Sequence, residues 1–320
     1  MDRERPAKIG IVGAGSVGAT IAYAAMIRGV ARQISLFDIN RGKVEAEVLD
    51  LNHGQQFAPQ ATVDGSDQIE SLAGSDVVVV TAGARQNPGQ TRMDLIAANA
   101  RILEKLLPQI VRVAPQALLL MVTNPVDVLT ELALEMTGLP WQRVIGSGTV
   151  LDSSRFRFLI AKACGVAVQN VHAYIAGEHG DSELPLWSSA SIGSILLSQW
   201  SVEGHGRMTS ADKEAIFRNV RDAAYQVIQG KGATNYAIGL AATNILEAIL
   251  YDERRVLPVS GRLQGFHGID DVCLSLPRIV GRSGIEQPLP IPITVDEEAG
   301  LIASAERIRE AVASVRQTKV

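Results

Sequence analysis

The feature that most constrains the fold of this chain is a glycine-rich segment near its start, Gly13-Ala-Gly15-Ser-Val-Gly18. It lies between an apolar run of strand length, residues 7–12, and a helix-like segment, residues 16–31. In such a turn Gly13 permits the sharp bend, Gly15 lets the backbone approach a pyrophosphate, and Gly18 lets the helix pack closely on the strand. The helix start then offers free N–H groups and a positive dipole end to phosphates. The segment therefore predicts a strand–turn–helix unit that binds a dinucleotide.

A carboxylate in the expected place supports this reading. Asp38 closes a second strand-like run, Gln33–Asp38, about twenty residues after Gly18. A carboxylate there accepts hydrogen bonds from ribose hydroxyls and repels a 2′-phosphate, which favours NAD over NADP. The alternative is a cluster of turn glycines beside a helix-capping aspartate.

Strand-like and helix-like segments alternate through the first half of the chain. After the first two strands, further strands are expected at Asp76–Thr81 and Ala117–Val122, and helices at Arg41–Asn52 and Thr91–Val113. The rhythm predicts an α/β fold, a Rossmann-type, doubly wound parallel sheet with right-handed crossovers. Ligands in such sheets bind beyond the carboxyl ends of the strands.

The rhythm changes after about Ser147, and we expect a mixed α+β substrate domain from there on. Its expected elements are two strand-like runs that flank Gly177, helices at Thr149–Cys164, Ser210–Gln229 and Asp296–Arg316, and short strands within Val256–Leu276. The predicted division is residues 1–147 for an NAD-binding domain and 148–320 for a catalytic domain.

The composition excludes several classes of protein. The 320 residues are 47% hydrophobic and 20% charged, with a net charge of −4 and scattered basic residues, so a nucleic-acid partner is not expected. The two cysteines, Cys164 and Cys273, lack CxxC spacing, which argues against a disulfide framework or a metal site and suits a reducing cytoplasm. No apolar run approaches the roughly eighteen residues of a membrane span, and no signal peptide precedes the first strand.

Three residues of the second half become informative when they are taken together. Asp152 and Arg155 share one face of the expected helix, and His179 lies in the segment AGEHGDSELP. Separately they would be a surface ion pair and a structural histidine. Together, a carboxylate can fix the tautomer of the imidazole and raise its pKa, while the arginine holds a substrate carboxylate.

With these segments in view, the sequence resembles the NAD-dependent L-lactate/malate dehydrogenase family. The resemblance spans most of the chain, in the family's order, through GIVGAGSVG, TAGARQNPGQTRMDL, VTNPVD, GSGTVLDSSRFRF, AYIAGEHGDSELP and KGATNYAIG. It implies hydride transfer between NADH and a 2-oxo acid, with His179 as proton donor and Asp152 as its orienting carboxylate. It also implies that Arg155 binds the substrate carboxylate and that Arg92 polarises the substrate carbonyl.

The resemblance assigns further residues to the substrate and the cofactor. Asn124 would hydrogen-bond the reacting oxygen, Thr234 would line the substrate pocket and Ile238 would pack against the nicotinamide. For Thr234 and Ile238 an ordinary helix position and core position remain open alternatives. The implied cofactor residues are Gly13, Gly15, Val17, Gly18, Asp38, Thr81, Gly83, Ala84, Asn99, Val122 and Asn124.

The loop AGARQNPGQTRMD, residues 82–94, distinguishes between substrates. Malate enzymes of the family usually carry an arginine two positions before its Pro-Gly, and here that position is Gln86. Pyruvate brings one carboxylate, which Arg155 neutralises, whereas oxaloacetate brings a second one that is costly to bury without a partner. Gln86 therefore favours pyruvate and lactate. Arg85, one position away, leaves a lactate-like malate dehydrogenase as the alternative.

A second pair of residues suggests regulation. In bacterial members activated by fructose 1,6-bisphosphate, an arginine and a histidine at the places of Arg157 and His172 bind the activator across a subunit interface. Both residue types are present, which implies a homotetramer that the bisphosphate stabilises or activates. The alternative is an exposed arginine and an ordinary strand histidine.

Other functions with a similar fold fit less well. A short-chain dehydrogenase needs a tyrosine four residues before a lysine, and none of the five tyrosines has one. An NAD-dependent glycosidase needs metal-binding cysteine or histidine, and neither cysteine is suitably placed. A non-catalytic NAD-binding scaffold would not need the set of His179, Asp152, Arg155 and Arg92.

Overall fold

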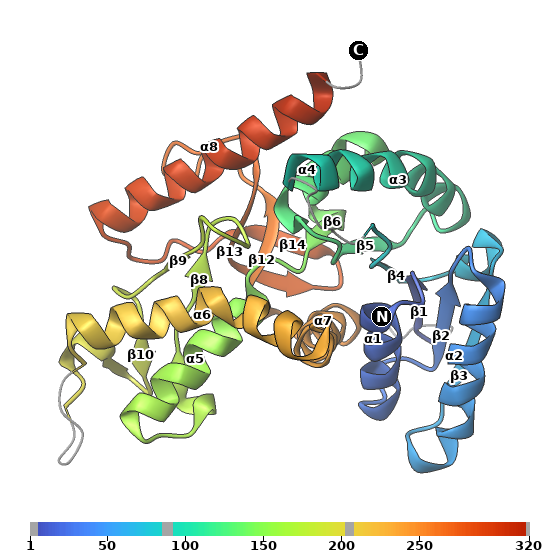
Figure 1. Cartoon of the computed structure of the whole chain (residues 1–320), viewed down its shortest axis with the longest axis horizontal. Helices are drawn as coiled ribbons and strands as arrows, with labels where there is room; N and C mark the ends of the chain where they lie inside the picture. The colour runs from blue at the N-terminus through green and yellow to red at the C-terminus, as the bar shows by residue number, and fades with distance from the viewer. Residues whose placement is uncertain (1–5, 85–91, 202–207, 318–320) are drawn as a thin grey trace.

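The computed structural model describes residues 6–84, 92–201 and 208–317, and for Arg92 it describes the backbone alone. Its centre is a nine-stranded sheet in the order β14-β13-β12-β6-β5-β4-β1-β2-β3 (Figure 1). The first six strands are parallel: β1 (Lys8–Val12), β2 (Gln33–Phe37), β3 (Thr62–Ser66), β4 (Val77–Val80), β5 (Leu118–Met121) and β6 (Val144–Gly146). The chain winds outward in both directions from the β1/β4 pair, so the predicted doubly wound Rossmann sheet is confirmed.

Helices cover both faces of this sheet (Figure 1). One apolar core joins it to α1 (Ser16–Ile27), α2 (Arg41–His53) and α7 (Tyr236–Leu250), and the other to α3 (Arg92–Val113), α4 (Val126–Thr137) and α8 (Val295–Gln317). The four valines of β4 are all fully buried, as expected of a strand with helices on both sides. Helix α1 ends four residues before the expected end, and Gly29 just beyond it turns the chain with φ +64°.

The strands of the second half continue the first sheet. Strands β12 (Arg255–Arg262), β13 (Cys273–Gly281) and β14 (Gly284–Pro288) are antiparallel to one another, and β12 pairs with β6 through Ser260 and Gly146. We expected only short strands within Val256–Leu276, although prolines are uncommon in the middle of a sheet. Pro258 and Pro277 instead lie opposite each other within the β12–β13 ladder, so two strands of 8 and 9 residues run without a break.

A smaller third core lies beside the sheet. It packs α5 (Val150–Cys164) and α6 (Ser210–Lys231) against β7 (Val171–His172) and β10 (Ser191–Ile192), and β11 (Ile195–Leu196) pairs with β10. A two-stranded piece, β8 (Ile175–Ala176) and β9 (Leu184–Pro185), flanks the segment that contains His179. The 3₁₀ helices are Gln55–Phe57, Ile69–Leu72, Trp141–Arg143, Val168–Asn170 and Leu197–Gln199. Among the described helices, none combines the length and apolar character that crossing a bilayer requires.

Candidate active site

A cleft of about 840 Å³ opens at the carboxyl ends of β1 to β4, where the strand order reverses. Of the residues expected at the cofactor, it is lined by Gly13, Gly15, Asp38, Thr81 and Gly83. Lys43, from α2, also lines it and brings a cation close to the glycine turn. A cleft at this reversal point is where a doubly wound sheet binds its ligand.

The three glycines of the turn meet different surroundings. Gly13 has φ +100°, and a Cβ added to Gly18 would lie 1.9 Å from the Gly13 carbonyl oxygen. A Cβ on Gly15 would have no neighbour nearer than 3.9 Å, at the Lys43 Nζ. Gly13 and Gly18 therefore shape the turn, whereas Gly15 leaves its backbone open to the cleft. Helix α1 starts directly after Gly15 without a side-chain cap among the described residues, which suits a pyrophosphate.

Asp38 is tied to the glycine turn. Its Oδ2 accepts the Ala14 N–H at 2.8 Å, and its Oδ1 accepts the Asn40 N–H at 2.9 Å. The Gly13 N–H also donates to the Phe37 carbonyl oxygen, at 2.7 Å. The carboxylate thus lines the cleft at the end of β2 and is hydrogen-bonded to the glycine turn.

Two side chains join the segments that follow β1, β4 and β5. The Thr81 hydroxyl donates to the Val12 and Gly13 carbonyl oxygens at 2.9 and 3.1 Å. The Asn99 amide accepts the Ala84 N–H at 2.7 Å and donates to the Asn124 carbonyl oxygen at 2.9 Å. The side-chain amide of Asn99 therefore connects the segment after β4 to the segment after β5.

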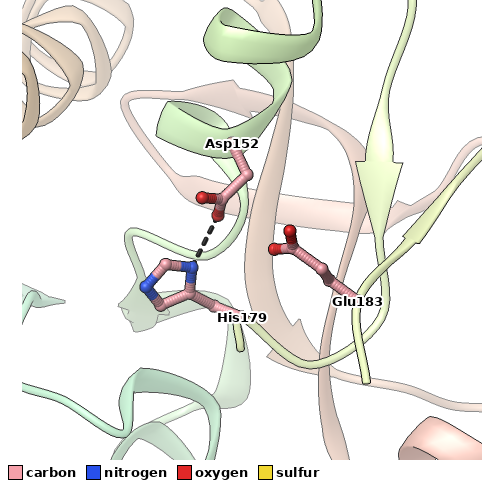
Figure 2. A group of neighbouring side chains, drawn as sticks. All are labelled: Asp152, His179 and Glu183. Carbon is pink, nitrogen blue, oxygen red and sulfur yellow. Dashed lines mark hydrogen bonds and ion pairs between the residues drawn. The ribbon is translucent and has the colours of Figure 1, made fainter. Parts of the chain in front are cut away.

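Three residues from the second half come together as the sequence led us to expect. His179 Nδ1 lies 2.5 Å from Asp152 Oδ2, and the Arg155 guanidinium lies 2.6 Å from Asp152 Oδ1 (Figure 2 shows the histidine pair). The Asp152 side chain is 2% exposed, and those of Arg155 and His179 are 16% and 23% exposed. Both carboxylate oxygens are thus occupied, and His179 Nε2 is the ring nitrogen left for a substrate.

The charges of this pair stabilise each other. Burial alone would lower the pKa of His179, but the charge and hydrogen bond of Asp152 raise it from 6.5 to about 9. Burial would raise the pKa of Asp152, yet the cations of His179 and Arg155 hold it below its ordinary value. The imidazole therefore carries its proton at neutral pH.

The backbone that carries His179 is held by side chains of α4 and α8. The His179 N–H donates to Asp127 Oδ2 at 2.7 Å, and Asp127 Oδ1 accepts the Ser275 hydroxyl at 2.7 Å. The Glu178 N–H donates to the Ser304 hydroxyl of α8 at 2.7 Å. Because Asp127 belongs to the first turn of α4, just after β5, this contact places the histidine segment at the carboxyl edge of the sheet.

Asp127 and Glu183 are residues whose place in the site we did not foresee. Asp127 is 1% exposed, and burial raises its pKa despite its hydrogen bonds. Glu183 is 6% exposed, and its carboxyl lies beside Asp152 and His179 (Figure 2). Both lie in segments that carry the family resemblance, VTNPVD and AGEHGDSELP. Their nearness to the site could therefore have been predicted from the sequence, but their burial could not.

The comparison with known families decides the identity of this arrangement. Residues 7–146 match the NAD binding domain of lactate/malate dehydrogenase, and residues 149–318 match its alpha/beta C-terminal domain. The chain belongs to the lactate/malate dehydrogenase family. The cofactor of the family's N-terminal domain is NAD, which agrees with the open backbone at Gly15 and the carboxylate at Asp38.

Relatives of the chain within this family are full-length matches. It is 51% identical over 310 residues to an L-lactate dehydrogenase of Bifidobacterium animalis subsp. lactis, covering 97% of both chains. It is 46% identical to an L-lactate dehydrogenase of Synechococcus, covering 96% of this chain and 98% of the relative. Among solved structures, the minor L-lactate dehydrogenase of Enterococcus mundtii superposes with a TM-score of 0.93 at 38% identity, covering 97% and 98% of the two chains.

Other residues assigned from the resemblance to this family have varied surroundings. Thr234, Ile238 and Val17 are partly buried, and Ile238 and Val17 pack against the α1/α7 core, to which Val122 belongs. Gln86 and Arg85 lie outside the described residues, as does the side chain of Arg92, the first residue of α3.

Arg157 and His172 lie on neighbouring elements. Arg157 Nε donates to the Ala173 carbonyl oxygen at 2.8 Å, and its guanidinium stacks 4.8 Å from the Tyr174 ring centre. His172, one residue before Ala173 on β7, is exposed.

Proposed function

We propose that this chain is an NAD-dependent L-lactate dehydrogenase, which reduces pyruvate to (S)-lactate with NADH and catalyses the reverse reaction. The observation that carries the proposal is the Asp152 carboxylate, which is shared between the proton donor His179 at 2.5 Å and the carboxylate-binding Arg155 at 2.6 Å. Because Asp152 holds both residues, a 2-oxo acid whose carboxylate binds Arg155 would present its carbonyl oxygen to His179. Its relatives with 51% and 46% identity are named L-lactate dehydrogenase.

The chemistry follows from the two nitrogens of His179. Bound NADH supplies a hydride to the carbonyl carbon of pyruvate. His179 Nε2 donates a proton to the carbonyl oxygen. Nδ1 keeps its own proton, which stays hydrogen-bonded to the Asp152 carboxylate. The ring leaves this step neutral, and in lactate oxidation the same nitrogen accepts the hydroxyl proton.

The two directions therefore need opposite protonation states. Pyruvate reduction requires the charged ring, which predominates below a pKa of about 9, whereas lactate oxidation requires the neutral ring and gains as the pH rises. Arg92 is the proposed cation beside the growing oxyanion, and Asn124 and Thr234 are the proposed polar groups around the substrate.

The substrate assignment rests on charge. One carboxylate of pyruvate is met by Arg155, and the proposed neighbour of the substrate's other end is the uncharged Gln86. Oxaloacetate would need a second cation, for which Arg85 is the candidate in the less favoured malate dehydrogenase reading. The glycine turn would hold the pyrophosphate of the cofactor, Asp38 its ribose and Ile238 its nicotinamide. The other residues proposed to hold it are Thr81, Gly83, Ala84, Asn99, Val122 and Asn124.

We extend the proposal to organisation and regulation. Residues 1–147 bind the cofactor and residues 148–320 carry the acid–base residues, in a cytoplasmic homotetramer activated by fructose 1,6-bisphosphate. The hydrogen bond from Arg157 to Ala173 supports the regulatory site, because Ala173 directly follows the exposed His172. If the bisphosphate alters neither half-saturation by pyruvate nor the oligomer mass, this part of the proposal is wrong.

The test is a substrate panel. NADH oxidation is measured with pyruvate, oxaloacetate and 2-oxobutyrate, each with and without fructose 1,6-bisphosphate. We expect the largest kcat/KM with pyruvate. A larger value with oxaloacetate would replace the proposal by a malate dehydrogenase, and no oxidation with any of the three would reject both.

A further inference from the structure

A third acid in the site has no place in the reaction described above. Glu183 lies between the turn at Gly180 and strand β9, and the residue is 6% exposed. Its carboxyl oxygen, one Asp152 oxygen and a His179 ring nitrogen all lie within 4.8 Å of one another. Figure 2 shows the carboxyl turned toward Asp152 and His179, without a bond to either.

The charged groups around Glu183 come from three elements. Asp152 and Arg155 face it from α5, His179 from the segment after β8, and Arg221 from α6. Within the described ranges, the Glu183 carboxyl has no hydrogen bond or ion pair. Arg155 is already paired with Asp152 at 2.6 Å, and Arg221 lies 3.6 Å from Asp222.

The cluster of Asp152, His179 and Glu183 suits a proton better than a metal ion. Both oxygens of Asp152 are occupied, one by the Arg155 guanidinium and the other by the imidazole. A metal cation among the three groups would lie beside the arginine's fixed positive charge, which opposes its binding. A proton on Glu183 removes a negative charge without adding a cation.

We propose that Glu183 is a positioning residue that controls how tightly His179 holds its proton, by changing its own charge beside the Asp152–His179 pair. The inference rests on the proposed function of His179 as the proton donor. When Glu183 is neutral, the imidazolium has Asp152 as its close countercharge. When Glu183 releases its proton to solvent, the imidazolium has a second anion within 4.8 Å and keeps its own proton to higher pH.

The directions of the two pKa shifts agree with this role. Burial, and then repulsion from Asp152, raises the pKa of Glu183 from 4.5 to about 8, so its charge changes near neutral pH. Once Glu183 is ionised, its charge raises the pKa of His179 and opposes the deprotonation of the ring. Asp127, from α4, also faces His179 and favours its charged form. Pyruvate reduction is thereby sustained into the alkaline range, at the expense of lactate oxidation.

The test is Glu183→Gln, which keeps the shape of the side chain and removes its charge. The pH dependence of kcat/KM is measured in both directions with saturating cofactor. We expect the loss of pyruvate reduction and the rise of lactate oxidation to move together to lower pH, on the order of one pH unit. A uniform loss of activity at every pH, with both limbs in place, would show a merely structural role and overturn the proposal.

Two further variants serve as controls. Glu183→Asp keeps the titratable group on a shorter side chain. We expect its pH limbs to lie between those of the wild type and those of Glu183→Gln. Glu178→Gln removes another buried carboxyl of the same segment, which is 5% exposed and bonded to Ser182. We expect its limbs at the wild-type pH; the same shift in this variant would mean that any charge change in the segment has this effect.

A direct titration separates this inference from the proposed function. The chain has five histidines, and the NMR signal of labelled His179 is the one that disappears in His179→Gln. Titrated in the complex with NADH, it should show a lower pKa in Glu183→Gln than in the wild type. An unchanged pKa would refute the role of Glu183, whatever substrate the enzyme proves to use.

Discussion

Replacing Asp152 by asparagine tests the electrostatic account of His179, the proposed proton donor. The variant keeps the size of the side chain and removes the charge that lies 2.5 Å from His179 Nδ1. The pKa of His179 is raised from 6.5 to about 9, a difference of 2.5 pH units or roughly 3 kcal/mol. Burial still opposes the charged ring in the variant, whereas the neighbouring carboxylates Glu183 and Asp127 still favour it, so we expect the pKa to fall toward 6.5.

This change makes the loss of activity dependent on pH. With a pKa of about 9, roughly nine-tenths of His179 is protonated at pH 8, whereas with a pKa of 6.5 only about 3% is. Pyruvate reduction should therefore fall by up to about thirtyfold at pH 8, with a smaller loss at pH 6 from this cause. The released Arg155 adds a loss in pyruvate affinity that does not vary in this way.

The assay is kcat/KM for pyruvate between pH 5.5 and 9.5, followed by NADH absorbance. Glu131→Gln is the matched control, because Glu131 is also a buried carboxylate paired with an arginine, Arg262 at 3.1 Å. We expect its alkaline limb to stay near the wild-type position. If Asp152→Asn also keeps its limb near pH 9, Asp152 does not sustain the charge of His179 and the reasoning fails.

Three other predictions concern the proton donor, the cofactor and stability. His179→Gln should lower turnover by about 10² to 10⁴-fold, whereas NADH binding, measured by fluorescence, should persist. Undiminished turnover would remove His179 from the mechanism. Asp38→Ser should raise the ratio of NADP to NAD use and also weaken NAD binding, because Asp38 holds the Ala14 N–H at 2.8 Å; an unchanged cofactor ratio would mean that another group selects the ribose. Glu183→Gln should stabilise the fold at pH 8 and have little effect at pH 4.5 in urea unfolding. The folded-state pKa of Glu183, about 8, exceeds the ordinary value of 4.5. The free energy of unfolding of the wild type therefore falls as the pH rises between these values, by up to roughly 5 kcal/mol. An equal effect of the substitution at pH 4.5 and pH 8 would contradict this account.

The parts of the molecule that the sequence predicts well are local ones. The glycine turn, Asp38 and the alternation of strands and helices depend on neighbours a few residues apart, and the Rossmann sheet follows from them. The His179–Asp152 contact joins residues 27 positions apart, and it was expected only because three chemically matched residues and a family resemblance agreed.

What could not be foreseen depends on distant partners. Asp127 reaches His179 across 52 positions, and Ser304 reaches Glu178 across 126. The residue letters show neither contact, because the fold brings α4 and α8 to the histidine segment. Likewise, the charge of Glu183 depends on its burial, which its place in a turn-like motif does not reveal.

The junction between β6 and β12 has a consequence for how the protein melts. Gly146 pairs with Ser260, and the Thr149 N–H donates to the Pro258 carbonyl oxygen at 3.1 Å, so the cofactor-binding strands and the strands behind the catalytic residues form one hydrogen-bonded ladder. Helix α7 belongs to the same apolar core as β1, β2 and α1. The half that contains the glycine turn therefore shares its core with the half that contains His179, and the two should unfold in one cooperative transition. A fragment of residues 1–147 would expose the bare edge of β6 together with the apolar surface that α7 covers, and it should aggregate instead of folding as an independent NAD-binding protein.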